Sequence, residues 1–390
     1  MGSSVPVPLA TLFLSFLRLG LTAFGGPAMV PHVRKVAVEK NAWLTPKEFQ
    51  DGVALCQAIP GATVMQLGAY IGLKANGPWG SLASFAAFIL PAFLLMFVLT
   101  LVYSETRNAR ALLAVFAGLQ VIVVSLVTNA AYDFGGKTMK DWRDGLLALG
   151  AGLFILAGGN PILAICAAAL LGLVAYRGLQ PPAGNPSAMA GDERAGLSRR
   201  GVLVLASLLG LGFAALYLAD RRLFDLAALM AKVDLFAMGG GFASVPLMYH
   251  EVVELRGWLD GHTFMDGIAL GQVTPGPIVV TATFAGYLQH GFPGAVVGTV
   301  AVFSPSLIIL WAVFPHFERL RHNAVFQRVL RGSLASFVGL LGAVAIRFAW
   351  AVSWDVPAGL LALATLAALI LKADVLWVVI AGAALSWAIF

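Results

Sequence analysis

The sequence predicts an all-α fold: a polytopic helical membrane protein whose two homologous halves form an inverted repeat with broken helices. Three observations predict it. Hydrophobic residues make up 59% of the 390 residues and charged residues only 11%, less than half of the roughly 25% typical of soluble domains. Apolar runs long enough to span a bilayer recur along the chain. A long motif of the first half also returns in the second half.

This composition excludes a soluble enzyme, a disordered protein and a coiled coil. The formal net charge is +6. The basic residues lie in loops between apolar runs, which is typical of loops on anionic lipid rather than of a surface that binds nucleic acid. We therefore expect the lipid bilayer as a partner and no nucleic acid.

A window of about 19 residues separates the chain into thirteen hydrophobic segments. They lie near 9–28, 49–73, 79–103, 111–132, 145–158, 161–177, 201–219, 223–246, 264–288, 293–315, 325–348, 356–371 and 373–390. The longest polar stretch, 180–200, is rich in proline, glycine and charge and has no periodicity, which predicts a linker. The expected domains are a first transporter-like half at 1–179 and a second at 201–390.

The most informative feature is a tandem duplication. When residues 25–61 are laid on 240–276, 17 of the 37 positions are identical, including a tryptophan, an aspartate and a Gln-x-x-Pro-Gly motif. Duplicated membrane units are typical of secondary transporters. Seven predicted segments, counted from the first helix of the first unit, precede the first helix of the second, and an odd number of crossings inverts the second unit. Segment 201–219 has no counterpart in the first half, so we expect it to be the inverting insertion.

Each copy of the Gln-x-x-Pro-Gly motif interrupts an apolar segment. The copies are Gln57, Pro60 and Gly61 in the first half and Gln272, Pro275 and Gly276 in the second. Proline removes a backbone donor and glycine loosens the helix, so the motif predicts a broken helix whose second half begins near the middle of the bilayer. The N-terminus of such a half-helix suits an anion. Two ordinary proline kinks are the alternative.

Glycine clusters end the first helix of each unit. They comprise Gly25 and Gly26 in the first half and Gly240 and Gly241 in the second. These clusters predict an unwound helix end where backbone approaches a substrate, or else a helix C-cap or close helix packing.

Two cations, Arg18 and Lys232, stand at equivalent positions, seven residues before Gly25 and Gly239, the first glycines of the two runs. Charge within a span marks a functional site by default, so we predict that both help to bind a dianion. Snorkelling of the side chains to the membrane surface is the alternative.

Asp51 and Asp266 are also repeat equivalents, each in the second turn of a predicted helix that begins after a capping residue, Thr45 or Asp260. They are candidates for proton coupling; the alternative is an acid favoured there by the helix dipole. The six histidines form no metal-ligand pattern. We predict no metal, no cofactor and no catalytic residue.

The motifs Phe24-Gly25-Gly26-Pro27, Trp43-Leu44 and Leu55-Cys56-Gln57-x-x-Pro60-Gly61, with Gly239–Gly241 and Leu270–Pro277, resemble the chromate transporter (CHR) family, of the long-chain two-domain type. The resemblance covers nearly the whole chain. This chain departs from the family at Ala62, where the motif usually continues with proline, and at Val64-Met65, where small hydroxyl residues are common, so we expect the first-half site to be less polar than usual.

The resemblance implies a bacterial inner-membrane transporter that exports chromate from the cytoplasm and confers chromate resistance. Its substrate would be chromate or a related oxyanion, with a homodimer as a further option. Uptake of sulfate or another oxyanion is an alternative, and so is an anion channel, since a pore can use the same helix ends. An enzyme within the membrane would need a nucleophile–base pair or metal ligands in the spans, and the sequence holds no such cluster.

Overall fold

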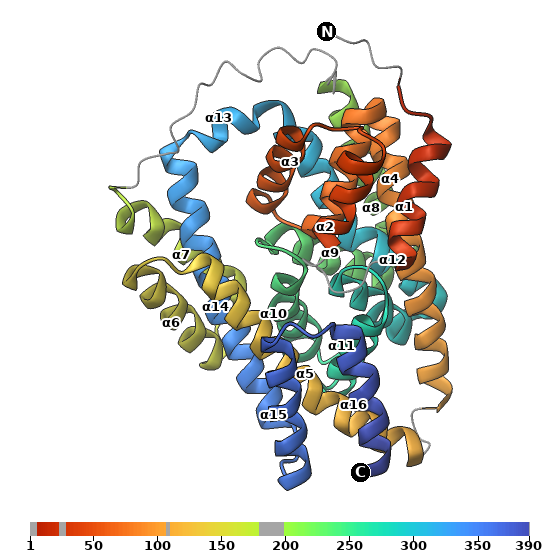
Figure 1. Ribbon diagram of the computed structural model, residues 1–390, viewed down its shortest axis with the longest axis vertical. Coiled ribbons are helices and arrows are strands. Elements are labelled where there is room, and N and C mark those ends of the chain that lie inside the picture. Colours follow the sequence, from red (N-terminus) through yellow and green to blue (C-terminus); the bar gives the residue numbers. More distant parts are fainter. Residues whose placement is uncertain (1–5, 23–28, 107–109, 179–198, 390) are drawn as a thin grey trace.

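The computed structural model describes residues 6–22, 29–106, 110–178 and 199–389 (Figure 1). These residues form helices and connecting turns, with no strand among them, which confirms the all-α prediction. Most of the predicted linker 180–200 lies outside the described residues.

The helices of the first half are short at its start and long at its centre. They are α1 (Leu9–Thr22), α2 (Met29–Arg34), the π-helical η2 (Lys35–Lys40), α3 (Pro46–Ala58), α4 (Thr63–Thr106), α5 (Arg110–Thr138), α6 (Trp142–Leu156) and α7 (Pro161–Ala175). The predicted capping box begins α3. The Glu48 backbone N–H donates a hydrogen bond to the Thr45 hydroxyl, and the Thr45 backbone N–H donates one to the Glu48 carboxylate.

The second half repeats this order after one additional helix, α8 (Arg199–Ala219). It contains α9 (Arg221–Phe236), η4 (Gly241–Ala243), α10 (Ser244–Tyr249), η5 (His250–Leu255), α11 (Gly261–Val273), η6 (Ile278–Val280), α12 (Thr281–Val313), η7 (Phe314–His316), α13 (Phe317–Arg321), α14 (Ala324–Ala351), α15 (Val356–Ile370) and α16 (Val375–Ile389). A shift of 215 residues lays α3 on α11, and one of 214 lays α6 on α15 and α7 on α16. The duplication read from the sequence is therefore also a duplication of the backbone.

The predicted spans 49–73 and 264–288 do break at the Pro-Gly motif, but their two halves fold back on each other. Tyr70, late in the first part of α4, donates a hydrogen bond of 3.0 Å to the carbonyl of Glu48, at the start of α3. Lys74 lies 3.7 Å from the Glu48 carboxylate. Since the far ends meet, the segment is a re-entrant hairpin with its tip at residues 59–62, rather than one interrupted crossing.

The second half contains the same hairpin. A methyl group on Gly267 of α11 would overlap the ring of Phe284, in the first part of α12. The tip of this hairpin is at residues 274–277. The two hairpins are named here the first and second re-entrant hairpins.

Each re-entrant hairpin continues through a sharp turn into a long helix. The turns are at Asn76-Gly77 in α4 and His290-Gly291 in α12, where the glycines have φ of 61° and 59°. In α12 the hydroxyls of Thr283 and Thr299 lie 2.7 Å apart across the turn. The residues after the first turn, 78–106, contain the predicted span 79–103, and those after the second, 292–313, contain all but the last two residues of the predicted span 293–315.

The long parts of α4 and α12 are equivalent and run antiparallel. The rings of Phe85 and Phe303 lie 6.4 Å apart, and Trp311 donates a hydrogen bond of 2.9 Å to Ser81. From the first contact to the second, the residue number rises along α12 and falls along α4. The two long helices are therefore antiparallel, and the two halves are inverted, as predicted. The count of seven crossings behind that prediction was wrong, because segment 49–73 is re-entrant and does not cross the membrane.

The helices form two bundles. The scaffold bundle is α5, α6, α7, α14, α15 and α16, and the hairpin bundle is α1 to α4 with α9 to α12. Within the scaffold bundle the halves are exchanged: the α6–α7 pair packs on α14, and the α15–α16 pair packs on α5. Figure 1 shows most of the scaffold bundle on the left and below, and most of the hairpin bundle on the right and above.

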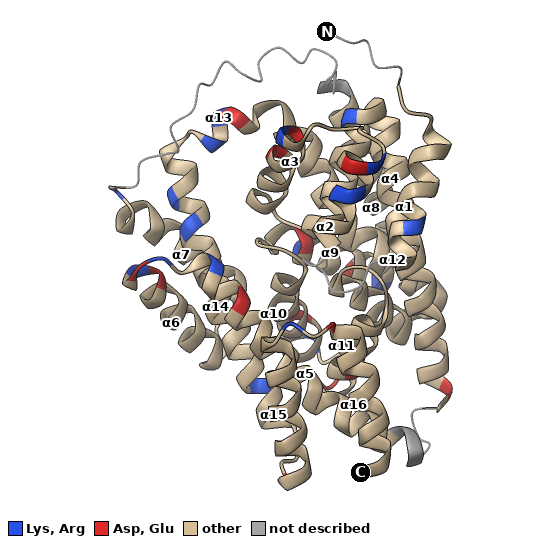
Figure 2. Cartoon of the chain, in the orientation of Figure 1, with Lys and Arg blue, Asp and Glu red and all other residues tan. Residues whose placement is uncertain are grey.

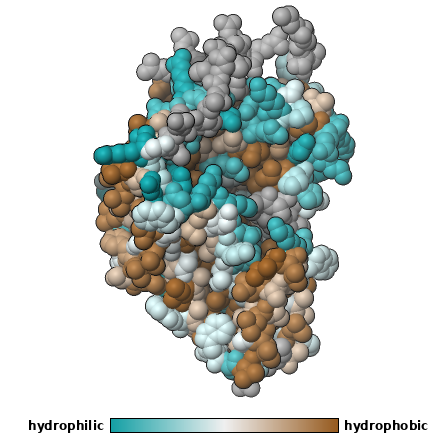
Figure 3. All heavy atoms as spheres, turned by 60° about the vertical axis from the view of Figure 1, so that its left-hand side comes forward, coloured by the Kyte–Doolittle hydropathy of each residue, from teal (hydrophilic) through white to brown (hydrophobic). Residues whose placement is uncertain are grey.

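Five described stretches are long and apolar enough to cross a membrane: Thr63–Thr106, Leu113–Thr138, Gly201–Ala219, Ile278–Arg321 and Ala324–Ala351. Figure 2 shows the charged residues gathered in the upper part and the centre, while most of the helix length carries none. Figure 3 shows hydrophobic side chains over the lower part of one face and hydrophilic ones above. This division is that of a protein embedded in a bilayer.

Candidate functional site

Three unwound segments meet inside the hairpin bundle. The end of α9 continues as residues 237–241, named here the Gly segment. The tip of the first re-entrant hairpin contacts it, since Gly61 N–H donates a hydrogen bond of 2.8 Å to the Ala237 carbonyl and Pro60 forms an isolated bridge with Met238. The second tip contacts the same segment, because a Cβ on Gly241 would lie 3.5 Å from Pro277. The two tips therefore meet at one place.

Glycine is required at both tips. Gly61 and Gly276 have φ of 116° and 114°, values that other residues rarely adopt. A methyl group on Gly61 would overlap Ser306, and one on Gly276 would lie 2.9 Å from the Cβ of Ala92. Ser306 and Ala92 are repeat equivalents on the long helices, so each tip packs against the long helix of the opposite half.

Helices begin directly after the two tips. α4 begins at Thr63, and η6 followed by α12 begins at Ile278. The first N–H groups of a helix have no partner within the helix, and its N-terminus carries a partial positive charge. Two such ends at one place favour an anion.

The two motif glutamines have different environments. Gln57 is exposed at the end of α3. Gln272 is 7% exposed, and its Nε2 has no hydrogen-bond partner. A buried donor without a partner costs about 1–3 kcal/mol, so Gln272 indicates a ligand that is held beside the second tip. A third glutamine, Gln66, donates a hydrogen bond of 2.5 Å to the Pro60 carbonyl and holds the first tip.

The two predicted cations have different environments. Arg18 is exposed on α1. Lys232 forms an ion pair with the buried carboxylate of Glu251, which also accepts a hydrogen bond of 2.5 Å from Arg256. Gly25 and Gly26 lie outside the described residues, whereas Gly240 belongs to the Gly segment, where its Cβ position would lie 3.6 Å from Thr63 Oγ1.

The two candidate aspartates also differ. Asp51 lies 3.3 Å from Arg321 of α13. Asp266 is buried and accepts hydrogen bonds from Tyr103 of α4, at 2.9 Å, and Gln120 of α5, at 2.8 Å. Asp266 thereby ties the second re-entrant hairpin to the scaffold bundle, a contact for which Asp51 shows no counterpart among the hydrogen bonds of the described residues.

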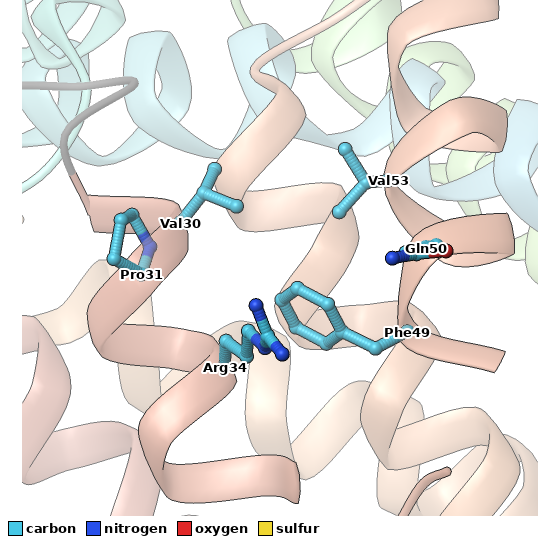
Figure 4. Close-up of a pocket in the computed structure, with 6 residues that line it drawn as sticks. All are labelled: Val30, Pro31, Arg34, Phe49, Gln50 and Val53. Atoms are coloured by element: carbon cyan, nitrogen blue, oxygen red, sulfur yellow. The ribbon is translucent and has the colours of Figure 1, made fainter. Parts of the chain in front are cut away.

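A cavity of about 280 Å³ separates α2 from α3 in the first half (Figure 4). Val30, Pro31 and Arg34 line it from α2, and Phe49, Gln50 and Val53 line it from α3, with Arg34 extending toward Phe49.

The equivalent place in the second half is closed. The Tyr249 ring packs 5.5 Å from Phe264 and 5.3 Å from Phe348 of α14. The second-half hairpins, α9–α10 and α11–α12, are therefore docked on the scaffold bundle. The first-half hairpins, α1–α2 and α3–α4, are open.

One carboxylate beside the tips was not among the residues predicted from the sequence. Asp234 of α9 is 1% exposed and accepts a hydrogen bond of 2.7 Å from the backbone N–H of Ser306. An acid within an apolar run was a visible signal, but Asp234 has no equivalent in the first half, and the repeat directed attention to paired residues.

Similarity to known proteins agrees with this architecture. The chromate transporter family matches residues 10–173 and again 224–387. The chain is 41% identical to an uncharacterized transporter of Methanocaldococcus jannaschii, over 97% of this chain and 94% of that protein. It is 29% identical to the chromate transport protein of Pseudomonas aeruginosa (99% and 94% covered) and 30% identical to that of Cupriavidus metallidurans (97% and 92% covered).

No solved structure matches the chain. The family matches each half once, and the two matched regions are the two inverted units of the fold. With its apolar helices, the chain is a multi-pass membrane protein, and it belongs to the chromate transporter family.

Proposed function

We propose that this chain is a secondary transporter that exports chromate from the cytoplasm across the inner (plasma) membrane and so confers chromate resistance. The observation that carries the proposal is the meeting of the two hairpin tips at the Gly segment. The names of two relatives, both chromate transport proteins, support chromate as the substrate.

In this proposal the dianion binds between the tips. Backbone N–H groups that follow Gly61 and Gly276 donate to its oxygens, and Gln272 supplies the amide donor that now has no partner. Each hydrogen bond to a charged group contributes about 1.5–3 kcal/mol. Pro60, Pro275, Gly240 and Gly241 keep the backbone open at this place. Gln57 lies at the entrance, since it is exposed.

Transport would follow from the asymmetry of the halves. The second-half hairpins are docked on the scaffold bundle and the first-half hairpins are open. Because the units are inverted equivalents, exchanging the two arrangements opens the site to the other side of the membrane. An inside-negative potential favours export of a dianion, at about 2.3 kcal/mol per charge per 100 mV.

The test is chromate flux in proteoliposomes of known protein orientation, with the pH gradient and the voltage varied separately. Saturable flux that excess sulfate does not inhibit supports the proposal. Flux that sulfate abolishes favours a general oxyanion carrier acting in uptake or export. Flux that does not saturate is evidence for a channel.

A substitution tests the binding site. Gln272→Leu removes the unpaired donor while keeping the side-chain volume, so the KM for chromate should rise about tenfold, the effect of one lost hydrogen bond of about 1.4 kcal/mol. Gln289→Leu, just before the turn in α12, where Gln289 donates to the Trp258 carbonyl, is the control and should leave the KM within about twofold. An unchanged KM for Gln272→Leu contradicts the placement of the anion.

A further inference from the structure

Asp234 is buried without a charged partner. It is 1% exposed, and the interaction of its carboxylate within the described residues is with Ser306. Asp144 and Glu251 are buried to a similar degree, but both form ion pairs with cations, Arg331 and Lys232 respectively. A buried carboxylate that accepts hydrogen bonds from neutral donors alone costs free energy to keep ionised.

Asp234 also adjoins the first hairpin tip from two directions. Its hydrogen-bond donor, Ser306, packs directly against Gly61. One turn further along the chain, Ala237 donates to the Asp234 carbonyl and accepts from Gly61 N–H. An anion at the tips therefore lies close to this carboxyl group.

The fold does not require an acid at this position. A shift of 214 residues lays Asp234 on Gly20 of α1 and Ser306 on Ala92 of α4. The α1–α4 pair packs as the α9–α12 pair does, with Gly20 against Phe88 and Pro91 and without any carboxyl group. The acid was thus gained or kept in one half only, which indicates a role other than helix packing.

Among the described residues, no cation compensates Asp234. On its own helix, Lys232 pairs with Glu251 of η5. The helices packed against α9 are α12, α8 and α10. Neither α12, nor Gly201–Ala219 of α8, nor α10 contains Asp, Glu, Lys or Arg, and the histidine of α12 is His290, at its turn. His250 of η5 pairs with Glu254.

We infer that Asp234 is a proton-binding site coupled to the oxyanion site. The protein then takes up one proton at Asp234 for each dianion that it binds. The inference rests on the proposed function. An ionised Asp234 repels the dianion across a medium of low dielectric, whereas a protonated one does not. By linkage, bound anion raises the affinity for the proton as much as bound proton raises the affinity for the anion. Substrate and proton then move together, and the loaded site carries one negative charge less.

The test measures chromate binding to purified protein over the pH range in which free chromate stays a dianion. The Kd of the wild type should rise about tenfold per pH unit where Asp234 loses its proton. Asp234→Asn, which keeps the shape and stays neutral, should bind with a Kd that is independent of pH. Asp225→Asn, on the exposed start of α9, is the matched control and should keep the wild-type slope.

A second measurement needs no variant. Adding chromate to wild-type protein in weakly buffered solution should withdraw about one proton per anion bound, and none for Asp234→Gly, which carries the first-half residue. Chromate binding by the wild type with no proton uptake, or a wild-type slope retained in Asp234→Asn, overturns the coupling and leaves the proposed function intact. Absence of chromate binding at every pH overturns the proposed function and this inference with it.

Discussion

At the scale of single residues, paired glycines mark the site. The Pro-Gly motif was visible in the sequence because a repeated Gln-x-x-Pro-Gly is specific, and its position at two meeting tips agrees with the prediction of paired helix ends. The sequence could not show that Gln272 is buried and Gln57 exposed, because that difference arises from which hairpin is docked on the scaffold bundle. Asp234 was missed because it breaks the repeat.

Gly61→Ala should reduce transport at least tenfold with the protein still inserted. A methyl group at this φ costs about 1–2 kcal/mol, and it would also displace Ser306 from the tip. Chromate flux normalised to the amount of protein in the membrane measures the effect. Gly145→Ala, on an open face of α6, should transport as the wild type does, and equal flux for both variants would show that the tip tolerates a side chain.

At the scale of elements, hydropathy predicted how many apolar runs there are and where they lie. It did not predict whether a run crosses the membrane or turns back within it. The segment 49–73 is long enough to cross a bilayer, so its length predicts one span. The structure instead turns it back at Pro60-Gly61, because Tyr70, Lys74 and the glycines at the helix crossing favour antiparallel packing of α3 on α4. Such contacts depend on distant residues and leave no periodic pattern in the sequence.

The exchange of helix pairs in the scaffold bundle leads to a prediction about stability. Asp144 of α6 is fully buried and is held by Arg331 of α14 at 2.7 Å. Arg331→Met leaves that carboxylate without a cation, which should destabilise the protein by about 3–5 kcal/mol. The melting temperature of the protein in detergent checks this.

Arg328→Met is the control for this change. Arg328 lies one turn earlier on α14 and bonds to the Arg177 carbonyl, not to an acid. The melting temperature should fall far less, and the double variant Asp144→Asn with Arg331→Met should recover part of the loss. A drop for Arg328→Met as large as for Arg331→Met would contradict a specific role of the buried pair.

At the scale of the whole molecule, the duplication was predictable and the asymmetry was not. Seventeen identities were enough to predict two homologous units, whereas their opposed orientation is established by the antiparallel contacts of α4 and α12. The conformation decides which unit is docked on the scaffold bundle. The two homologous sequences are compatible with docking of the first unit or of the second. The cavity at α2 and α3, and its closed counterpart, record that choice.

Equivalent cysteines should report the exchange of these arrangements. In a background without Cys56 and Cys166, Val53→Cys lines the cavity, whereas Ile268→Cys takes the place of a fully buried side chain. A water-soluble thiol reagent should label the first at least about tenfold faster than the second, since opening a closed helix contact costs more than about 1.4 kcal/mol.

Saturating chromate should move the two labelling rates in opposite directions, because one hairpin pair closes as the other opens. The same substitution at Val325, exposed on α14, is the control and should not respond. Rates that rise or fall together would indicate general loosening and contradict the exchange.

The exchanged helix pairs also constrain how the protein is made. A ribosome finishes α6, with its acidic Asp144, long before it reaches Arg331 in the second unit. Until that arginine is inserted, the first unit holds an acid without a cation at the start of α6, and the face of small residues on α6, with Ala148 and Gly152, lacks Gly339 of α14, against which it packs. A nascent chain that stops before α14 is therefore an obvious substrate for membrane proteases, and premature termination should remove the product rather than release a half-sized pore.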